Sequence, residues 1–306
     1  MRKMKFALIG AGRWGKIYIQ TISRLANMEI SLLCTSNLEN RKLVDSNCHI
    51  CSDWRDILTK KNIDALILAV PPSIQFEILL ANLKSKIPLI LEKPLTIDAK
   101  QAKEIKSLYS KENIISLVDH IYLFHPAYTT LKKNLHLIGN IKSIKTEGGS
   151  FGPFRHHTPP LWDYGPHDLS MCLDIIKDYP NKITTTRISR QKNKETLEEV
   201  WEVNLQFSSG IQTKSIIGNG MKKKTRKMEV IGEEGSLIFD DFDKDKLNLK
   251  KNFEISKILI PNESKLPLDI AIETFVDAIR GKHDSRLGLT LGSDIVTILE
   301  ECYLNN

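Results

Sequence analysis

The chain has 306 residues, of which 26% are charged and 41% hydrophobic, the proportions of an ordinary globular protein with room for two domains of about 100 to 200 residues each. No apolar run approaches the roughly 18 to 20 residues that cross a bilayer, and the apolar start is interrupted by Arg13, so we expect a cytoplasmic protein without a membrane partner. The net charge of +7 comes largely from scattered lysines, and five scattered cysteines do not make a disulfide framework.

The first predicted turn is GAGRWG, residues 10–15, between an apolar run and a helical pattern. G-x-G-x-x-G in that setting is typical of a dinucleotide-binding turn. Gly10 would allow the tight turn, Gly12 the approach of a pyrophosphate, and Gly15 the packing of helix on strand. The N–H groups at the helix start would face the anion. An ordinary strand-to-helix turn is the alternative interpretation.

Short apolar strands alternate with amphipathic helices up to about residue 120, which predicts a doubly wound parallel sheet, an α/β fold. The expected strands are residues 6–9, 30–34, 65–70, 87–91 and 114–118. Asp53 and Asp98 are the expected caps of two helices. Cys48 and Cys51 form a C-x-x-C without a second pair, so we interpret them as small apolar residues before the helix at Asp53 and expect no metal site.

From about residue 140 longer strand-like runs joined by hairpin turns predict a mostly antiparallel sheet. The expected strands are residues 200–207, 211–217, 228–231 and 237–239, and the expected closing helices are residues 268–280 and 293–303. We therefore expect a Rossmann dinucleotide-binding domain at residues 1–122 and a C-terminal α+β domain with a large open sheet at residues 123–306.

The basic run KKKTRK, residues 222–227, predicts a solvated turn between two strands. A nucleic-acid patch is one alternative, but no helix-turn-helix, zinc-finger or RNP-like signature accompanies it, so we expect no nucleic-acid partner. Attraction of an anionic substrate is the other alternative.

Glu92-Lys93-Pro94 follows the fourth expected strand, at the edge where open α/β sheets bind ligands. An ammonium held there could stabilise a developing alkoxide. A surface lysine before a turn proline is the alternative.

Residues 161–175, LWDYGPHDLSMCLDI, gather aromatic, acidic and imidazole groups. Pro166 suits the first position of a helix, and His167 would then lie in its first turn as a neutral base. Asp163 would orient that ring or contact the substrate hydroxyl. The alternative is a capping arrangement in which Asp163 binds helix N–H groups and His167 is structural.

These motifs, with Val70-Pro71-Pro72 and the late GEEGSL of residues 232–237, occur in the order of one family. Over nearly its whole length the chain resembles the glucose-fructose oxidoreductase, inositol dehydrogenase and MocA family of nicotinamide-dependent oxidoreductases.

The resemblance implies that NAD or NADP binds at residues 10–15, including Arg13 and Trp14, with Val70, Pro71, Pro72 and Glu92 also in contact. It implies a catalytic role for Lys93, whose peptide bond to the proline is commonly cis, and contacts from Asp163 and His167 to the reacting hydroxyl, with His167 as base. The implied substrate, a sugar, nucleotide-sugar or cyclitol, sits between domains, and the open sheet forms a homodimer or homotetramer. A non-catalytic sensor or scaffold of the same fold is the rival interpretation.

Three departures from the family pattern bear on specificity. Ser170 stands where many members carry a carboxylate after G-x-H, and Gln75 stands where a histidine commonly follows the proline pair. The second strand ends in Thr35-Ser36-Asn37 without an acidic residue for the ribose, so Ser36, Asn37 or Arg41 could bind a 2′-phosphate and we favour NADP or dual use. Arg155 would suit a phosphate or carboxylate of the substrate, or it is an exposed loop arginine.

Overall fold

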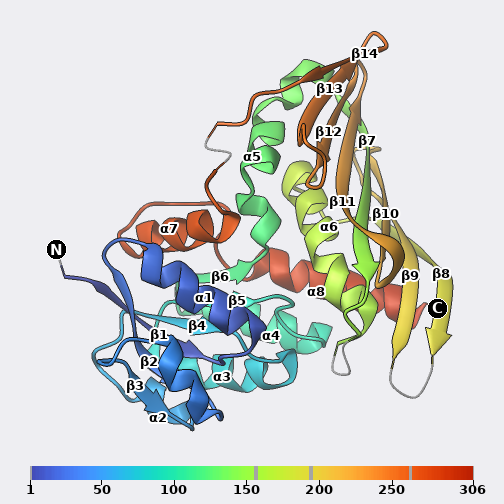
Figure 1. Cartoon of the computed structure of the whole chain (residues 1–306). Helices are drawn as coiled ribbons and strands as arrows, with labels where there is room; N and C mark the ends of the chain where they lie inside the picture. The colour runs from blue at the N-terminus through green and yellow to red at the C-terminus, as the bar shows by residue number, and fades with distance from the viewer. Residues whose placement is uncertain (1, 155–157, 193–195, 262–263, 306) are drawn as a thin grey trace. The chain divides into compact units, whose positions relative to one another are not determined.

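The computed structural model describes residues 2–154, 158–192, 196–261 and 264–305. Their contacts divide them into two compact units (Figure 1). The first comprises the chain up to Asp119 together with Leu268–Ser293, and the second comprises His120–Pro267 together with the residues from Asp294 onward. Arg155 lies outside the described residues. None of the helices within these ranges is both long enough and apolar enough to cross a membrane.

A six-stranded sheet forms the centre of the first unit, in the order β3-β2-β1-β4-β5-β6. All its neighbouring strands are parallel, which confirms the predicted doubly wound sheet. Every residue of β4, β5 and β6 is buried, as expected for strands covered on both faces. The strands are β1 (Met4–Ile9), β2 (Met28–Cys34), β3 (His49–Cys51), β4 (Ala65–Leu68), β5 (Leu89–Glu92) and β6 (Ser116–Asp119).

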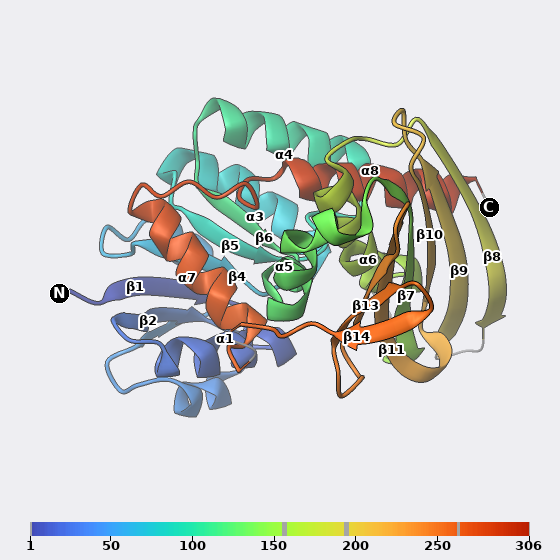
Figure 2. The ribbon, with the colours of Figure 1, turned by 90° about the horizontal axis from the view of Figure 1, so that it is seen from above.

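Helices lie on both faces of this sheet (Figures 1 and 2). They are α1 (Arg13–Arg24), the 3-10 helix η1 (Leu38–Leu43), α2 (Arg55–Leu58), α3 (Pro72–Ser85), α4 (Ala99–Lys111) and most of α7 (Pro267–Ile279). Asp98 caps α4 as predicted, because its carboxylate accepts the Gln101 N–H at 2.7 Å. Asp53 accepts the Arg55 N–H at 2.9 Å, although Trp54 is the residue at the N-cap of α2.

The short edge strand β3 was not predicted. Cys48 and Cys51 do not simply precede a helix, because Cys51 ends β3 and pairs with Cys34 of β2, while Cys48 lies just before the strand. Burial raises the pKa of the Cys48 thiol to about 11. A three-residue strand is too short to produce a period-2 pattern, and for that reason the sequence alone did not reveal it.

The second unit is built on an eight-stranded sheet in the order β14-β13-β12-β11-β7-β10-β9-β8. Its neighbours are antiparallel except β7 and β10, which confirms the predicted mostly antiparallel sheet. The strands are β7 (Ile141–Phe151), β8 (Lys182–Lys192), β9 (Leu197–Gln206), β10 (Gln212–Gly218), β11 (Gly220–Gly232), β12 (Ser236–Asp240), β13 (Leu247–Lys251) and β14 (Glu254–Lys257).

Helices cover one face of the second sheet (Figure 2). They are α5 (Pro126–Lys133), α6 (Pro160–Ile176) and most of α8 (Thr290–Leu304), with the short 3-10 helices η2 (Ile121–Phe124) and η3 (Leu135–Ile138). α6 packs on β7, β9 and β10, and α5 packs on β12. Near its C-terminus α8 docks on β8 and β9. The Thr185 hydroxyl donates to the Cys302 carbonyl at 3.2 Å, and the ring centroids of Trp201 and Tyr303 are 5.9 Å apart. Within the described ranges no helix covers the opposite face.

The basic run lies inside β11, so the predicted turn was wrong. The register of β11 against β7 shifts between Gly220 and Thr225, and the intervening residues form a bulge. Lys222, Lys223 and Lys224 are exposed in it. Arg226, which follows, is 4% exposed and points to the covered face. The run was predicted as a turn because consecutive basic residues are usually solvent-exposed, and the sequence does not show that the Arg226 side chain is buried.

Candidate active site

The three glycines of the first turn differ in what their missing side chains would meet. A Cβ on Gly10, which has φ +96°, would lie 2.3 Å from the Ala69 carbonyl oxygen of the neighbouring strand end. A Cβ on Gly15 would lie 2.1 Å from the Gly10 carbonyl oxygen. A Cβ on Gly12 would meet no heavy atom of the described chain within 4 Å, its sequence neighbours aside. Gly10 and Gly15 are therefore required by the fold, and Gly12 faces open space.

The open space lies at the N-terminus of α1. Gly12 is the N-cap residue and makes no side-chain cap hydrogen bond. The first N–H groups of a helix have no acceptors within it, and they bind anions. Arg13 is exposed and Trp14 half-buried on this first turn. The turn therefore leaves space for an anion at the N-terminus of α1, as the predicted diphosphate site requires.

The other predicted cofactor residues follow the strands beside β1. In the sheet order β3-β2-β1-β4-β5-β6, the chain builds outward from β1 through β2 to β3 on one side and from β4 through β5 to β6 on the other. The order therefore reverses between β1 and β4, and open α/β sheets bind ligands at the carboxyl ends of the strands beside such a switch point. Thr35–Asn37 follow β2, and Val70–Pro72 follow β4 and lead into α3. Glu92 ends β5 and is followed by Lys93. All of these residues therefore lie at one edge of the first sheet.

The loop after β2 is shaped by its own side chains. The Thr35 hydroxyl oxygen accepts from the Asn40 amide at 2.9 Å, and the Asn37 side chain accepts the Glu39 N–H at 2.9 Å. The Arg41 guanidinium donates to the carbonyl oxygens of Ser46 and Cys48. Ser36 and Asn37 are exposed. Of the residues predicted for a 2′-phosphate, Arg41 is thus committed to backbone carbonyls.

Lys93 lies in a turn that is held by a buried amide. The Gln75 side-chain amide on α3 donates to the carbonyl oxygens of Glu92, Pro94 and Leu95 at 3.1, 2.9 and 3.0 Å. Gln75 is fully buried, and the Lys93–Pro94 peptide is cis. Gln75 therefore binds the backbone on both sides of Lys93, a positioning role that its place in the sequence did not reveal.

The predicted start of the catalytic helix was wrong. α6 begins at Pro160 with Pro159 as its N-cap, so Pro166 lies inside the helix. Pro160 takes the first-turn position because its absent N–H would have no acceptor there. His167 consequently lies beyond the first turn, where the effect of the helix dipole has fallen off. Asp163 is the acidic residue of that first turn.

Asp163 and His167 lie on one face of α6, because residues four apart in a helix are neighbours. Both side chains are half-buried. The Tyr122 ring of η2 contacts the His167 ring edge-on, with centroids 5.3 Å apart and an interplanar angle of 80°. The second unit therefore places an imidazole beside a carboxylate and fixes the ring against an aromatic neighbour.

A buried ion pair lies behind this arrangement. Arg226 of β11 pairs with Asp168 of α6, and their side chains are 5% and 0% exposed. The guanidinium carbon lies 4.9 Å from the centroid of the Tyr122 ring, which itself contacts His167. Burial lowers the pKa of Arg226, but the charge of Asp168 outweighs it and leaves the pKa raised. Burial raises the pKa of Asp168, and the charge and hydrogen bond of Arg226 oppose this effect. The buried guanidinium and its carboxyl partner therefore lie behind the candidate base.

A second carboxylate holds the other side of Tyr122. Asp241 accepts from the Tyr122 hydroxyl at 3.4 Å, and it lies 3.1 Å from His125 Nε2 and 3.0 Å from Lys246 Nζ. Burial raises the pKa of Asp241, but these two hydrogen bonds outweigh it and hold the pKa well below its usual range. Tyr122 is thus fixed from two sides, by Arg226 and by Asp241.

The sequence did not predict Tyr122, Asp168, Arg226 or Asp241 as functional residues. It also did not predict Asp119, which ends the buried strand β6. Asp119 could have been found as an acidic residue at the end of a buried strand. Asp168 directly follows His167 in the sequence, and no local pattern indicates that it pairs with a distant arginine. Arg226 was hidden in a basic run, and no local signal marks an arginine as buried.

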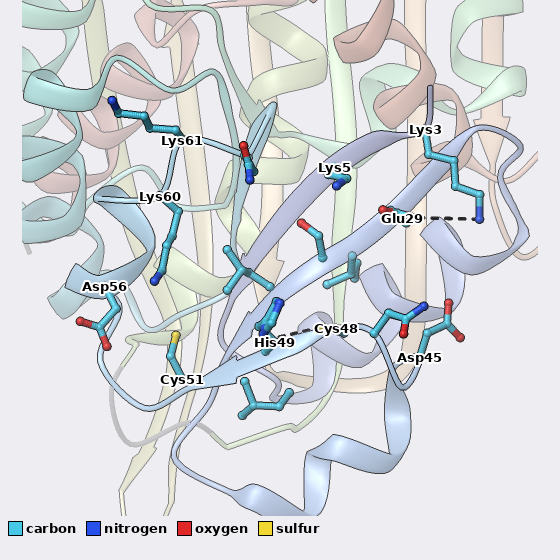
Figure 3. Close-up of a pocket in the computed structure, with 16 residues that line it drawn as sticks. Lys3, Lys5, Glu29, Asp45, Cys48, His49, Cys51, Asp56, Lys60 and Lys61 are labelled. Carbon is cyan, nitrogen blue, oxygen red and sulfur yellow. Dashed lines mark hydrogen bonds and ion pairs between the residues drawn. The ribbon is translucent and has the colours of Figure 1, made fainter. Parts of the chain in front are cut away.

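A separate hollow of about 760 Å³ lies on the first unit (Figure 3). Its lining comes mainly from the starts of β1 and β2 and from β3, with Lys3 paired to Glu29 at 3.8 Å. Lysines 5, 60 and 61 share it with Asp45 and Asp56, so its charge is mixed. The glycine turn follows the end of β1, whereas this hollow includes its start. It is therefore distinct from the predicted cofactor edge.

Comparisons with known proteins bear on both units. A model of an oxidoreductase family with an NAD-binding Rossmann fold, the glucose-fructose oxidoreductase, inositol dehydrogenase and MocA family, matches residues 4–120. A crystal structure from Magnetospirillum magnetotacticum MS-1, described as that of an oxidoreductase, is 34% identical with a TM-score of 0.91, and the match covers 98% of this chain and 99% of that one.

Two curated proteins of Bacillus subtilis (strain 168) match part of the chain. The uncharacterized oxidoreductase YrbE is 27% identical over 55% of this chain and 52% of its own length. The scyllo-inositol 2-dehydrogenase (NADP(+)) IolW is 22% identical over 64% of this chain and 58% of its own length. The chain therefore spans little more than half the length of the curated relatives it matches.

Proposed function

Since the chain belongs to the glucose-fructose oxidoreductase, inositol dehydrogenase and MocA family, we propose that it is an NAD(P)-dependent dehydrogenase or reductase acting on a hydroxyl or keto carbon of a sugar, nucleotide-sugar or cyclitol. The observation that carries the proposal is the first turn, where Gly12 leaves room for a diphosphate at the N-terminus of α1. The similarity to scyllo-inositol 2-dehydrogenase supports a polyol substrate.

We assign the proton chemistry to three side chains. A nicotinamide, when bound, exchanges a hydride with the substrate carbon. His167 accepts the proton of the hydroxyl in the oxidative direction, and Asp163, on the same face of α6, orients the imidazole. The Lys93 ammonium stabilises negative charge that develops on the substrate oxygen. The rival proposal, a sensor or scaffold without chemistry, leaves the presence of all three groups without a reason.

We further propose NADP or dual use in preference to strict NAD specificity. No acidic residue ends β2 to repel a 2′-phosphate, and Ser36 and Asn37 are exposed there. Arg41 supports this less well, because it donates to the carbonyl oxygens of Ser46 and Cys48.

Nicotinamide absorbance tests the proposal directly. The purified protein is mixed with sugars, inositols and nucleotide-sugars, with NAD, NADP and their reduced forms run separately. We expect turnover with at least one substrate, and we expect His167→Ala and Lys93→Ala each to lose about 100-fold or more in kcat while still binding cofactor.

Cofactor binding is followed in each variant by nicotinamide fluorescence, and folding by circular dichroism, so that a folding defect is not taken for a catalytic one. Near-normal turnover in both variants would remove the assigned roles. Cofactor binding without turnover across the panel would favour the sensor.

A further inference from the structure

Two carboxyl groups meet in the first unit beside Lys93. Glu92 at the end of β5 and Asp119 at the end of β6 are register partners in the parallel ladder. They are 7% and 2% exposed. Tyr18 of α1 is fully buried, and its hydroxyl donates to Asp119 Oδ2 at 2.9 Å. Three titratable side chains from three elements therefore meet at the edge of the sheet where Lys93 follows β5.

Two buried carboxylates this close cannot both carry a charge at little cost, because burial and mutual repulsion both favour a bound proton. Burial raises the pKa of Glu92 well above its usual value, and the charge of Asp119 adds to this effect while Lys93 opposes it. Burial also raises the pKa of Asp119 to about 6, against the hydrogen bond from Tyr18 and the charge of Lys93. Burial and the closeness of the two carboxyl groups thus both favour a proton bound to the pair.

Titratable groups from the neighbouring elements act on the pair of Glu92 and Asp119. Tyr18 comes from α1, Lys93 from the turn after β5, and the two carboxyl groups act on each other. Burial raises the pKa of Tyr18 well above its usual value, and the charges of Asp119 and Glu92 raise it further, so its hydroxyl remains a donor. His120 follows Asp119 in the chain and is the next titratable residue.

We propose that Glu92, Asp119 and Tyr18 form a proton-sharing cluster that keeps a single negative charge beside the Lys93 ammonium, and that Asp119 and Tyr18 are positioning residues acting through Lys93. The inference rests on the role proposed for Lys93. Either carboxylate can carry the charge, so removing one leaves the charge on the other. Removing both leaves the ammonium without its anionic partner.

Infrared spectroscopy tests the shared proton without substrate. The difference spectrum between the native protein and Glu92→Gln is expected to show a protonated carboxyl band at neutral pH. A native protein that lacks this band carries two ionised carboxylates, and the proposal is then wrong. This measurement does not depend on turnover.

Steady-state kinetics test the consequence for Lys93. We expect Asp119→Asn to lower kcat less than about tenfold and to change the acid limb of the pH profile of kcat/KM, which the native pair influences near the pKa of Asp119, about 6. The double variant Glu92→Gln/Asp119→Asn is expected to lose about 100-fold, comparable to Lys93→Ala. Tyr18→Phe should shift the same limb, because it removes the hydrogen bond to Asp119.

Thr21→Val is the matched control for Tyr18→Phe, because Thr21 is buried in the same helix and lies outside the cluster. It should leave the pH profile unchanged. Full activity of the double variant, in a protein where Lys93→Ala is inactive, would overturn this inference and leave the proposed function intact. Full activity of Lys93→Ala would instead overturn the role on which the inference rests.

Discussion

Gly12 and Gly15 share one turn but are required for different reasons. The Cβ position of Gly15 is occupied by the carbonyl oxygen of Gly10, 2.1 Å away, so the fold itself excludes a side chain. The Cβ position of Gly12 is open, and its φ of −70° suits any residue. A side chain at Gly12 would therefore disturb only what binds there.

An alanine substitution should therefore affect cofactor binding at Gly12 and protein stability at Gly15. We expect Gly12→Ala to leave the free energy of unfolding within about 0.5 kcal/mol of native and to weaken NAD(P) binding at least about tenfold. We expect Gly15→Ala to lower the free energy of unfolding by about 1–3 kcal/mol, because the backbone must move. Urea unfolding and nicotinamide fluorescence titration measure the two quantities. Unchanged cofactor affinity in Gly12→Ala would contradict the diphosphate assignment.

At the residue scale, the sequence predicted positions better than contacts. The location of Lys93 followed from its place after a buried strand, and the glycine turn from its place between strand and helix. The role of Gln75 could not be predicted, because its three carbonyl partners belong to a turn 17 to 20 residues away. The helix start predicted at Pro166 was wrong because α6 begins earlier, with Pro160 in its first turn.

At the scale of elements, α6 is joined to the sheet by a buried charge. Asp168 of α6 reaches Arg226 of β11 across β7, where Gly148 leaves the space they occupy. A Cβ on Gly148 would lie 2.1 Å from Asp168 Oδ2 and 2.2 Å from Arg226 Nη1. Three elements therefore meet at one ion pair, and β7 accommodates it with a glycine.

Removing either partner of this pair should be costly, and the two losses should not add fully. We expect Arg226→Met and Asp168→Asn each to lower the free energy of unfolding by about 3–5 kcal/mol, because a buried charge is left without its partner. The double variant should fall short of the sum by about 1–3 kcal/mol. Urea unfolding of the four proteins measures this coupling.

Lys223→Met serves as the control, because Lys223 is exposed in the bulge of the same strand. Its effect should stay within about 0.5 kcal/mol. Strict additivity of the two single variants would show that the ion pair contributes nothing specific to the joining of α6 and β11.

Elements with continuous apolar runs were predicted, whereas short strands and the long, largely polar strands β7 and β8 were not. β4 and β5 were expected because their sequences form apolar runs, and the structure buries every residue in them. β3 has three residues, and β14 is exposed throughout, so neither has a hydrophobic pattern. The bulge in β11 depends on its pairing with β7, a contact between segments about 70 residues apart that no local pattern encodes.

At the scale of the whole molecule, the chain returns to each unit after leaving it. α7 belongs largely to the first unit although about 150 residues of the second unit precede it, and most of α8 belongs to the second unit. The sequence predicted both helices from their periodicity. Their partners could not be predicted, because long-range contacts decide which core buries an amphipathic helix.

The uncovered face of the second sheet is charged. Lys145, Glu147, Lys214, Lys227 and Glu229 surround a hollow of about 230 Å³ on it, together with Ile216. Lys214 pairs with Glu202 of the neighbouring strand at 2.7 Å. Lysines and glutamates thus alternate where an apolar face would be expected for a permanent interface. We retain the proposal that this face forms the homo-oligomer, held by complementary charges.

Such an interface is expected to be sensitive to salt, because exposed charges are screened. Sedimentation equilibrium should show a dimer whose dissociation constant rises at least about tenfold between about 0.05 M and about 0.5 M salt. Lys214→Glu should weaken the dimer at low salt by a similar factor, since it sets like charges together. Lys103→Glu, the same charge change on the exposed side of α4, should not. A dimer that is indifferent to salt and to Lys214→Glu would form through another surface, and the charged sheet would then face solvent in the assembly.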